Sequence, residues 1–279
     1  MRVSLVQTTL HWENPVANRE MLGRTLAALR GHTDLVVLPE MFTTGFTMNA
    51  AALAEPMDGP TVEWLRTLAR DLDAAVTGSF ICLPTEASAK EDISTSTDAT
   101  ADTYFNRLVW MYPDGRCEVY DKRHLFGLAG ENLSYTAGKK RLVVEWLGWR
   151  ICPLICYDLR FPVWSRNRAS GANPEKKSAY DLLIFVANWP ERRSHHWRSL
   201  LVARAIENQA FTIGVNVVGK DGNGYEYLGD SALIDFAGQP VVQISRQEGV
   251  FTAKLSMEDL SNYRQQLPFL SDSDYFECF

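Results

Sequence analysis

The first third of the chain alternates apolar and polar residues in a way that predicts a β-α-β unit followed by further α/β structure. Residues 2–8 alternate as in a half-buried strand, and the pair Asn14-Pro15 is typical of a helix N-cap followed by the first turn. The apolar run at 34–38 indicates a buried strand. A second amphipathic helix is expected after Pro60, and it leads to a strand over 75–83.

Two hairpins are predicted in the middle of the chain. Residues 104–112 and 116–121 flank a Pro-Asp-Gly turn, and residues 141–146 and 149–155 flank a Leu-Gly pair. Further elements are expected as strands over 181–187, 211–218, 231–235 and 250–255 and as a helix over 194–209. This order of elements predicts mixed sheets with helices packed outside them.

Two segments are predicted to be insertions on the surface. Residues 85–102 are rich in Ser, Thr, Ala and Asp, and residues 170–179 contain a proline and two lysines. Because no linker divides the apolar segments, we expect a single domain over 1–279, with its core at about 1–255. Residues 256–279 are expected to form a C-terminal helix and tail. The tail is too apolar for a solvated end, so a subunit interface is one place where it could dock.

The composition is that of an ordinary globular protein, with 46% apolar and 22% charged residues among 279. Lys and Arg total 28 against 34 Asp and Glu, and no long basic run occurs. This balance argues against nucleic acid or an anionic membrane as the partner and favours small molecules or further copies of this chain. The N-terminal residues alternate as a strand rather than forming a signal peptide, and no apolar run is long enough to cross a bilayer.

The five cysteines do not form a disulfide or zinc pattern, because their number is odd and no two pairs stand at zinc-binding spacing. Reduced thiols, and therefore a cytoplasmic location, are the simplest expectation. The neighbouring pair His195-His196 has no third ligand at a useful spacing, so we predict no metal site there and interpret Ser194 as the start of a helix with two exposed histidines.

Cys156 is the first candidate for chemistry. The apolar strand 149–155 ends at this cysteine, polar residues follow it, and Pro162 disfavours helical geometry at Phe161. Cys156 is therefore predicted on the turn that leaves the strand, where a nucleophile projects into a cleft and backbone N–H groups are free to bind an anion. The alternative is that Cys156 is a small core residue, as most free cysteines are.

Two charged residues occupy similar positions. Glu40 follows the buried strand 34–38, and ligand crevices in open α/β sheets form at the carboxyl ends of strands. Lys122 leaves the hairpin strand 116–121 and is followed by His124 and two apolar residues, so its ammonium could face the same cleft. The alternatives are a solvated loop carboxylate for Glu40 and an ordinary surface charge for Lys122.

Three segments in this order resemble the nitrilase, or carbon–nitrogen hydrolase, superfamily: Val36-Val37-Leu38-Pro39-Glu40, Tyr120-Asp121-Lys122-Arg123-His124-Leu125-Phe126 and Ile155-Cys156-Tyr157-Asp158-Leu159-Arg160-Phe161-Pro162. The resemblance extends from the first strand to about Leu255 through matches at 185–190, 204–209 and 229–231. It implies an α/β fold of four layers, the α-β-β-α sandwich. It also implies a Glu, Lys, Cys triad on Glu40, Lys122 and Cys156, with Glu131 as a second glutamate beside the lysine.

Within this superfamily the sequences of the lysine and cysteine segments are most similar to those of the ω-amidase branch. The resemblance implies hydrolysis of the terminal amide of 2-oxoglutaramate or 2-oxosuccinamate through a thioester on Cys156, without a cofactor. In this scheme Lys122 and the Tyr157 backbone N–H hold the oxyanion. Candidate substrate contacts are the aromatic residues Phe126 and Trp189 and, for the substrate carboxylate, Arg192 or Arg193. A homodimer is the family expectation.

Other functions remain open from the sequence. Related carbon–nitrogen hydrolases act on deaminated glutathione, aliphatic amides or N-carbamoyl compounds, and the residues above do not exclude them. A non-catalytic binding or assembly protein with the same fold is a further alternative, although such a protein would have no need to keep Glu40, Lys122 and Cys156 together.

Overall fold

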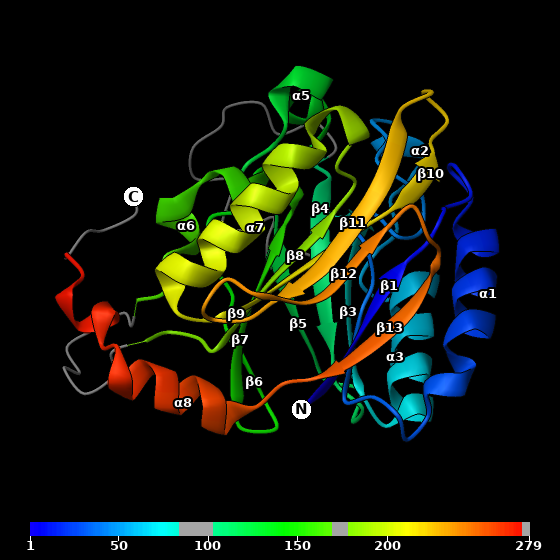
Figure 1. Cartoon of the computed structure of the whole chain (residues 1–279). Helices are drawn as coiled ribbons and strands as arrows, with labels where there is room; N and C mark the ends of the chain where they lie inside the picture. Colours follow the sequence, from blue (N-terminus) through cyan, green and yellow to red (C-terminus); the bar gives the residue numbers. More distant parts are fainter. Residues whose placement is uncertain (84–102, 169–177, 275–279) are drawn as a thin grey trace.

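Two β-sheets packed face to face between helices form the structure, a computed structural model that describes residues 1–83, 103–168 and 178–274. Helices lie outside both sheets, so the layers follow one another as helix, sheet, sheet, helix (Figure 1). The predicted four-layer α-β-β-α sandwich is confirmed. The predicted insertion 85–102 and most of 170–179 lie outside the described residues, as does the end of the tail, 275–279.

The first sheet has six strands in the order β13 (Gly249–Lys254), β1 (Arg2–Gln7), β2 (Leu35–Val37), β3 (Ala75–Cys82), β4 (Phe105–Met111) and β5 (Cys117–Asp121). β1, β2 and β3 are parallel, whereas β4 and β5 continue as an antiparallel hairpin. Helices α1 (Pro15–Leu26) and α3 (Pro60–Leu72) cover its outer face (Figure 1). The short helix α2 (Ala50–Leu53) lies between α1 and α3 in the chain.

The second sheet has seven strands: β10 (Val218–Lys220), β11 (Glu226–Ile234), β9 (Phe211–Asn216), β8 (Leu182–Ala187), β7 (Trp149–Ile155) and β6 (Val144–Trp146) in order, with β12 (Pro240–Ser245) paired to β11. β7, β8 and β9 are parallel. The helices of this half are α6 (Pro162–Ser165), α7 (Ser194–Asn208) and α8 (Met257–Gln266), and the short helix α5 (Glu131–Ser134) lies between β5 and β6 in the chain. Short 3-10 helices are η1 (Ala27–Leu29), η2 (Gly127–Ala129), η3 (Cys156–Arg160), η4 (Glu191–Arg193) and η5 (Phe269–Asp272).

The two-residue period of β2 explains how one strand serves two cores. Leu35 and Val37 belong to the cluster between the sheets, whereas Val36 and Leu38 pack with the helix residues of α1 and α3. All four side chains are fully buried. Because burial of one such side chain contributes about 1.5–3 kcal/mol, this short strand is held firmly on both faces. The residue that follows it, Pro39, therefore leaves the sheet at a fixed position.

Most predicted elements are present. The short helices α2, α5 and α6 were not predicted, the strand predicted over 141–146 begins only at Val144, and further differences lie in the last third of the chain. The Asn14 side chain caps α1 by accepting from the Ala17 N–H at 3.1 Å, as its position suggested. β11 begins at Glu226, five residues before the predicted strand over 231–235, and β10 and β12 were not predicted. β12 has exposed side chains at most positions, so its hydrophobic pattern is weak and its strand conformation depends on pairing with β11.

The C-terminal helix α8 docks on the second sheet through one buried leucine and one arginine. Leu260 is fully buried, and the Arg264 guanidinium donates to Asp181 Oδ1 at 2.7 Å and to the carbonyls of Tyr180 and Gln209. In the tail Leu270 is buried, but the Phe269 side chain is 58% exposed. The expected docking of the tail is therefore partial within the described residues.

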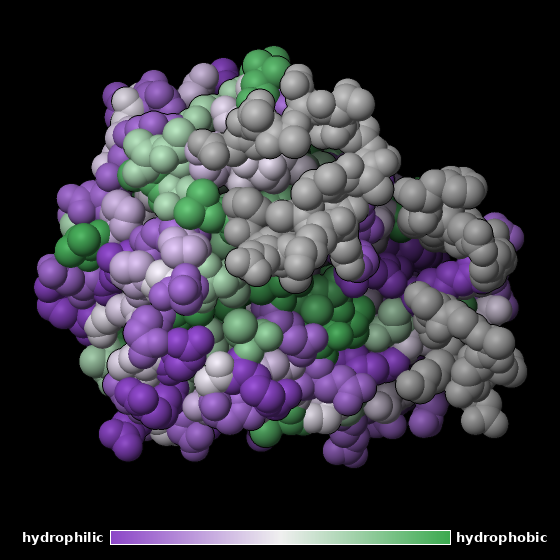
Figure 2. Space-filling model, turned by 180° about the vertical axis from the view of Figure 1, so that it is seen from behind, coloured by the Kyte–Doolittle hydropathy of each residue, from purple (hydrophilic) through white to green (hydrophobic). Residues whose placement is uncertain are grey.

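Figure 2 shows the face opposite to that of Figure 1, where a hydrophobic band crosses the middle of a largely hydrophilic surface. Over the described ranges, no helix is both long enough and apolar enough to cross a membrane.

Candidate active site

Four strand ends converge at one edge of the sandwich and carry the polar side chains of the site. Glu40 follows β2 and Lys122 follows β5 in the first sheet, whereas Cys156 follows β7 and Asn188 follows β8 in the second. β5 runs in the same direction as β2, because two antiparallel pairings separate it from the parallel strand β3. The carboxyl ends of these strands therefore meet, as expected for a ligand crevice in an α/β protein.

The Lys122 ammonium is fully buried and lies between two carboxylates. Its Nζ donates to Glu40 Oε1 at 2.8 Å and to both carboxylate oxygens of Glu131 at 2.9 Å. Both glutamates are also fully buried. The predicted neighbourhood of Glu40, Lys122 and Glu131 is present, and Glu131 is held in turn by the Phe126 N–H, which donates to Oε2 at 2.5 Å.

Hydrogen-bond donors reach both oxygens of the Glu40 carboxylate. Asn106 Nδ2, from β4, donates to Oε1 at 2.9 Å, and the Asn188 backbone N–H donates to Oε2 at 2.8 Å. The Asn188 side chain also donates to the Glu40 carbonyl oxygen at 2.7 Å. Groups from both sheets therefore fix this carboxylate. A general base needs such a fixed position to accept a proton within hydrogen-bond distance.

Cys156 stands at the turn that the sequence predicted, because β7 ends at Ile155 and η3 begins with the cysteine. Its φ is +42°, a left-handed conformation that residues other than glycine seldom adopt. Such a conformation costs about 1–3 kcal/mol and persists only where the surroundings determine it. The Cys156 residue is 9% exposed, so the thiol is accessible from one side only.

Asp158 holds this turn in place. Its fully buried carboxylate accepts from the Ile155 N–H at 3.1 Å, from the Tyr120 hydroxyl at 2.7 Å and from the His124 N–H at 3.0 Å, and His124 Nδ1 lies 2.8 Å from Oδ1. Ile155 precedes Cys156, whereas Tyr120 and His124 lie on either side of Lys122. One carboxylate therefore ties the thiol segment to the ammonium segment.

The charges around the thiol set its protonation state. Burial raises the pKa of Cys156 well above its usual value, and the charge of Glu40 raises it further, whereas the Lys122 charge lowers it. Burial alone would lower the pKa of Lys122, but the charges of Glu131 and Glu40 outweigh it and raise the pKa. The resting site therefore contains a neutral thiol beside a permanently charged ammonium.

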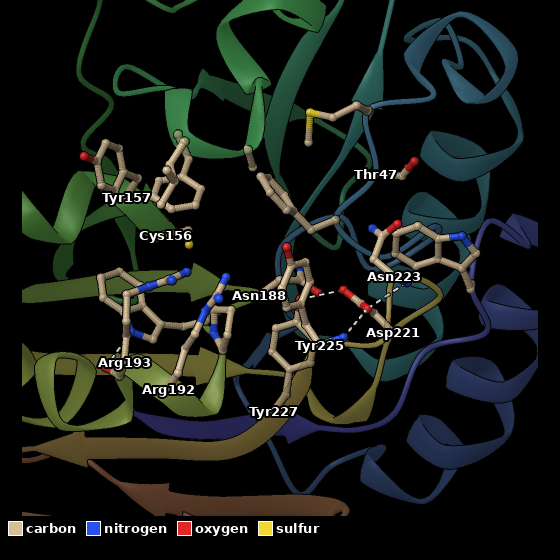
Figure 3. A pocket seen from close by; sticks show the side chains of 18 of the residues that line it. Thr47, Cys156, Tyr157, Asn188, Arg192, Arg193, Asp221, Asn223, Tyr225 and Tyr227 are labelled. Atoms are coloured by element: carbon tan, nitrogen blue, oxygen red, sulfur yellow. Dashed lines mark hydrogen bonds between the residues drawn. The ribbon is translucent and has the colours of Figure 1, made fainter.

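A cavity of about 880 Å³ opens above the thiol (Figure 3). All four predicted substrate contacts line it, namely Phe126, Trp189, Arg192 and Arg193, together with Cys156 and Tyr157. The remaining walls come from the segments 12–13, 46–49 and 128–129, from Arg160, Asn188 and Pro190, and from Asp221, Asn223, Tyr225 and Tyr227. Its volume lies within the range of small-molecule sites, about 300–1,000 Å³.

Residues 2–265 match the family model described as carbon–nitrogen hydrolase. The chain belongs to the carbon–nitrogen hydrolase family. It is 43% identical over 280 residues to omega-amidase YafV of Escherichia coli strain K12, and the match covers 100% of this chain and 99% of that protein. It is 30% identical over 273 residues to the 2-oxoglutaramate amidase of Bacillus subtilis strain 168, with 97% and 96% covered.

A solved structure gives the same result for the whole fold of this carbon–nitrogen hydrolase. XC1258 of Xanthomonas campestris, described as a CN-hydrolase superfamily protein with an arsenic adduct in the active site, has a TM-score of 0.90 and 48% identity. The match covers 100% of this chain and 99% of that chain. The predicted superfamily and its similarity to ω-amidases are thereby confirmed.

Three arginines of the carbon–nitrogen hydrolase line the cavity near the thiol, and each lies over an aromatic ring. Arg160 lies over Trp189 at 4.7 Å, Arg192 over Tyr225 at 4.8 Å and Arg193 over Phe126 at 5.1 Å, measured to the ring centroids. In the part of the chain that the structure describes, none of the three forms an ion pair with a carboxylate. Burial lowers the pKa of Arg193, and the charge of Arg192 lowers it further. An anion in the cavity would relieve this repulsion.

Sequence reasoning missed four residues of this site: Asn106, Asp158, Arg160 and Asn188. Asp158, Arg160 and Asn188 stand within the quoted family segments, and this position was the available signal. Asn106 lies inside strand β4 with no such signal, since its role depends on which strand pairs with β5.

No metal centre is evident among the described residues, where no three His, Cys, Asp or Glu side chains could hold one ion. His195 and His196 are exposed at the start of α7, and His196 Nδ1 lies 3.1 Å from Arg160. Ser194 begins this helix, as predicted, and its hydroxyl donates to Asp230 Oδ2 at 2.5 Å.

Proposed function

We propose that this carbon–nitrogen hydrolase is an ω-amidase that releases ammonia from the terminal amide of 2-oxoglutaramate or 2-oxosuccinamate and leaves the 2-oxo dicarboxylate. The observation that carries the proposal is the buried Glu40–Lys122–Glu131 network beside a strained, largely buried thiol that lines a cavity with three arginines. The names of the Escherichia coli and Bacillus subtilis relatives support this choice of substrate.

The first half-reaction begins with a neutral thiol. Glu40 accepts the Cys156 proton as Sγ attacks the amide carbon, and the raised pKa of Cys156 is the reason that a base is needed at this step. Glu40 then gives the proton to the departing ammonia, which leaves a thioester on Cys156. In the second half-reaction Glu40 removes a proton from water, the hydroxide attacks the thioester, and the thiol is reformed.

The oxyanion of each tetrahedral intermediate is held by Lys122 and by the backbone N–H of Tyr157. Lys122 keeps its charge throughout, because Glu131 and Glu40 raise its pKa. Tyr157 directly follows the thiol in the first turn of η3, so its N–H lies one residue from the reacting centre. Glu131 is then a positioning residue, since its carboxylate binds Lys122 and the Phe126 N–H.

The substrate carboxylate binds to the arginines of the cavity wall. Arg192 and Arg193 are the two candidates from the sequence, and Arg160 is added by its place in the same wall. A guanidinium matches a carboxylate in two parallel hydrogen bonds, and each ring beneath an arginine fixes the plane of that guanidinium. We expect Arg193→Gln to raise the KM for 2-oxoglutaramate at least about tenfold, in line with the loss of a charged hydrogen bond.

The test is ammonia release from 2-oxoglutaramate beside glutamine, asparagine, a simple aliphatic amide and an N-carbamoyl amino acid. Wild type and Cys156→Ala are assayed in parallel. Release from 2-oxoglutaramate that vanishes in the variant supports the proposal, and a thioester trapped on Cys156 by mass spectrometry supports the intermediate. Release from another amide alone would overturn the substrate and keep the mechanism. Folded protein that is silent on every amide would favour a non-catalytic role.

The assembly and location are part of the same proposal. We propose a cytoplasmic homodimer built from a single domain. The exposed Phe269 and the apolar residues of the tail support the homodimer, and the free thiols of Cys82, Cys117, Cys152 and Cys156 support the location. The cluster shared by the two sheets supports the single domain. Sedimentation equilibrium measures the mass directly, and a monomer at micromolar concentration would contradict the homodimer.

A further inference from the structure

The cavity is much larger than the proposed substrate. 2-Oxoglutaramate has ten non-hydrogen atoms, and even at the volume of one liquid water per atom, about 30 Å³, it would fill about 300 Å³. The cavity measures about 880 Å³. More than half of it therefore remains when the small amide is bound.

The two ends of the cavity differ in charge. Arg192, Arg193 and Tyr157 lie on the side of Cys156, whereas Thr47 and Asn223 lie at the opposite end (Figure 3). Glu13 belongs to that distal end, because its Oε1 accepts from the Thr47 hydroxyl at 2.5 Å. Among the described residues that line the cavity, the three arginines are the only cations. The distal end is therefore acidic and polar.

Glu13 has the free hydrogen-bonding capacity that a ligand would need. Its Oε2 accepts from Asn49 Nδ2 at 3.2 Å, so each carboxylate oxygen has one neutral donor and can accept another. The other acid of the cavity, Asp221, is already used by the Tyr227 hydroxyl and by the backbone N–H groups of Asn223 and Tyr225. The Glu13 backbone has a φ of +50°, a conformation that a carboxyl residue holds only where the structure requires it.

The wall beside Glu13 is closely packed. The Trp12 ring is packed against the backbones of Gly45 and Gly222, where any added Cβ would meet the ring. This contact joins the loop after β1 to the turn between β10 and β11.

We propose that this enzyme also hydrolyses N-(aminoalkyl) amides of the same 2-oxo dicarboxylic acids, with the terminal ammonium of the leaving amine bound by Glu13. The inference rests on the proposed function, because the arginines and the thiol are used in the same way. Carboxylate binding on the thiol side places the acyl chain there, so the substituent on the amide nitrogen is the part that extends toward Glu13.

The chemistry balances as in the simple amide. Sγ of Cys156 forms a bond to the acyl carbon, the carbon–nitrogen bond breaks, and the thiol proton goes to the leaving nitrogen through Glu40. The product that leaves first is a diamine in place of ammonia. Water then hydrolyses the thioester. Its hydroxyl joins the acyl carbon, and its proton returns to the Cys156 thiolate.

The experiment compares 2-oxoglutaramates whose nitrogen carries an aminoalkyl chain of two, four or six methylenes with alkyl and carboxyalkyl chains of matched length. Kinetics are followed by release of 2-oxoglutarate for wild type, Glu13→Gln and Glu226→Gln. Glu226 is an exposed acid between two cavity residues that does not itself line the cavity, so it controls for general charge. We expect the wild type to prefer the best aminoalkyl chain over its carboxyalkyl match by about tenfold in kcat/KM.

Glu13→Gln should reduce this preference to about twofold and leave turnover of unsubstituted 2-oxoglutaramate unchanged, whereas Glu226→Gln should keep the preference. If the enzyme hydrolyses 2-oxoglutaramate but none of the N-substituted amides, the inference is overturned and the proposed function stands. Equal rates for aminoalkyl and alkyl chains, or a preference that survives Glu13→Gln, would also overturn it. If 2-oxoglutaramate itself is not hydrolysed, the proposed function fails and the inference fails with it.

Discussion

Replacement of Lys122 by methionine tests the buried charge network directly. The substitution keeps most of the side-chain volume and removes the ammonium that lies between Glu40 and Glu131. Two buried carboxylates then face each other without a cation. We therefore expect two separate losses, one of transition-state stabilisation and one of folding free energy.

The size of the folding loss follows from the geometry. Glu40 Oε1 and Glu131 Oε1 lie 2.8 and 2.9 Å from the same Nζ atom. The two oxygens are therefore less than about 6 Å apart, and two unit charges at that distance repel by about 3 kcal/mol at an effective dielectric constant of about 20. Loss of one partner of a buried ion pair lowers the free energy of unfolding by roughly 3–5 kcal/mol, and the calculated repulsion agrees with this value. Loss of the oxyanion donor should lower kcat by about a hundredfold to a thousandfold.

A second substitution separates the two losses. Lys122→Met with Glu131→Gln removes the repulsion but does not restore the ammonium, so stability should recover by about 2 kcal/mol while kcat stays low. Urea unfolding measures the first quantity and ammonia release the second. For Lys122→Met alone, the repulsion raises the pKa of the carboxylates in the folded state. Its deficit in unfolding free energy relative to wild type should therefore shrink as the pH falls from neutral, because protonation relieves the repulsion.

A control for ordinary loss of stability is Asp181→Asn. Asp181 pairs with Arg150 and Arg264 at the start of β8, the end of the strand opposite to Asn188, and it does not line the cavity. This variant should be less stable but should keep its kcat. The reasoning is refuted if Lys122→Met unfolds at the same urea concentration as wild type at neutral pH. It is refuted equally if the double variant is no more stable than the single one.

Three further predictions concern the support of the site and the pH response of the fold. Asp158→Asn removes the charge from a carboxylate that makes four contacts. We expect kcat to fall at least about tenfold and the free energy of unfolding in urea to fall by about 2–3 kcal/mol. An unchanged kcat would contradict the positioning role of Asp158. Gly138→Ala places a Cβ against the Asp121 carbonyl beside Lys122, so stability should fall by about 1–3 kcal/mol and kcat should fall with it, whereas a rise in KM alone would contradict the reasoning. Burial raises the pKa of Cys152 from 9.0 to about 12, so the unfolded chain loses this proton first as the pH rises. Unfolding free energy should therefore fall above about pH 9 by up to about 1.4 kcal/mol per pH unit from this thiol, and Cys152→Ala should make the decline less steep.

The sequence was sufficient to predict the elements that carry the triad. Glu40 and Cys156 follow apolar strands, which hydrophobic periodicity predicts, whereas Lys122 follows a hairpin strand that the Pro-Asp-Gly turn indicates. The left-handed turn at Cys156 was foreseen as a turn, although its φ of +42° could not be read from the residues. The resemblance to a family then connected three segments that are separated by 82 and 34 positions along the chain.

The supporting residues could not be predicted in the same way. Asn106 is one residue of a buried strand, and its contact with Glu40 depends on the register of β4 against β5, in which Arg107 pairs with Asp121. A shift of one residue would turn the Asn106 side chain to the other face of the sheet. Register in turn depends on packing over the whole sheet, which local sequence does not encode.

Asp158 shows why the triad and its support have to be considered together. A left-handed cysteine is unfavourable by about 1–3 kcal/mol, and it is retained here because the Asp158 carboxylate binds the backbone just before it. The same carboxylate binds the Tyr120 hydroxyl and the His124 N–H, which flank the ammonium residue. The turn that carries Cys156 can therefore shift relative to Lys122 only if buried, charge-assisted hydrogen bonds break. The thiol and the ammonium thus keep their relative positions through one shared acceptor, and the precision of the site is a property of the contact between the two sheets.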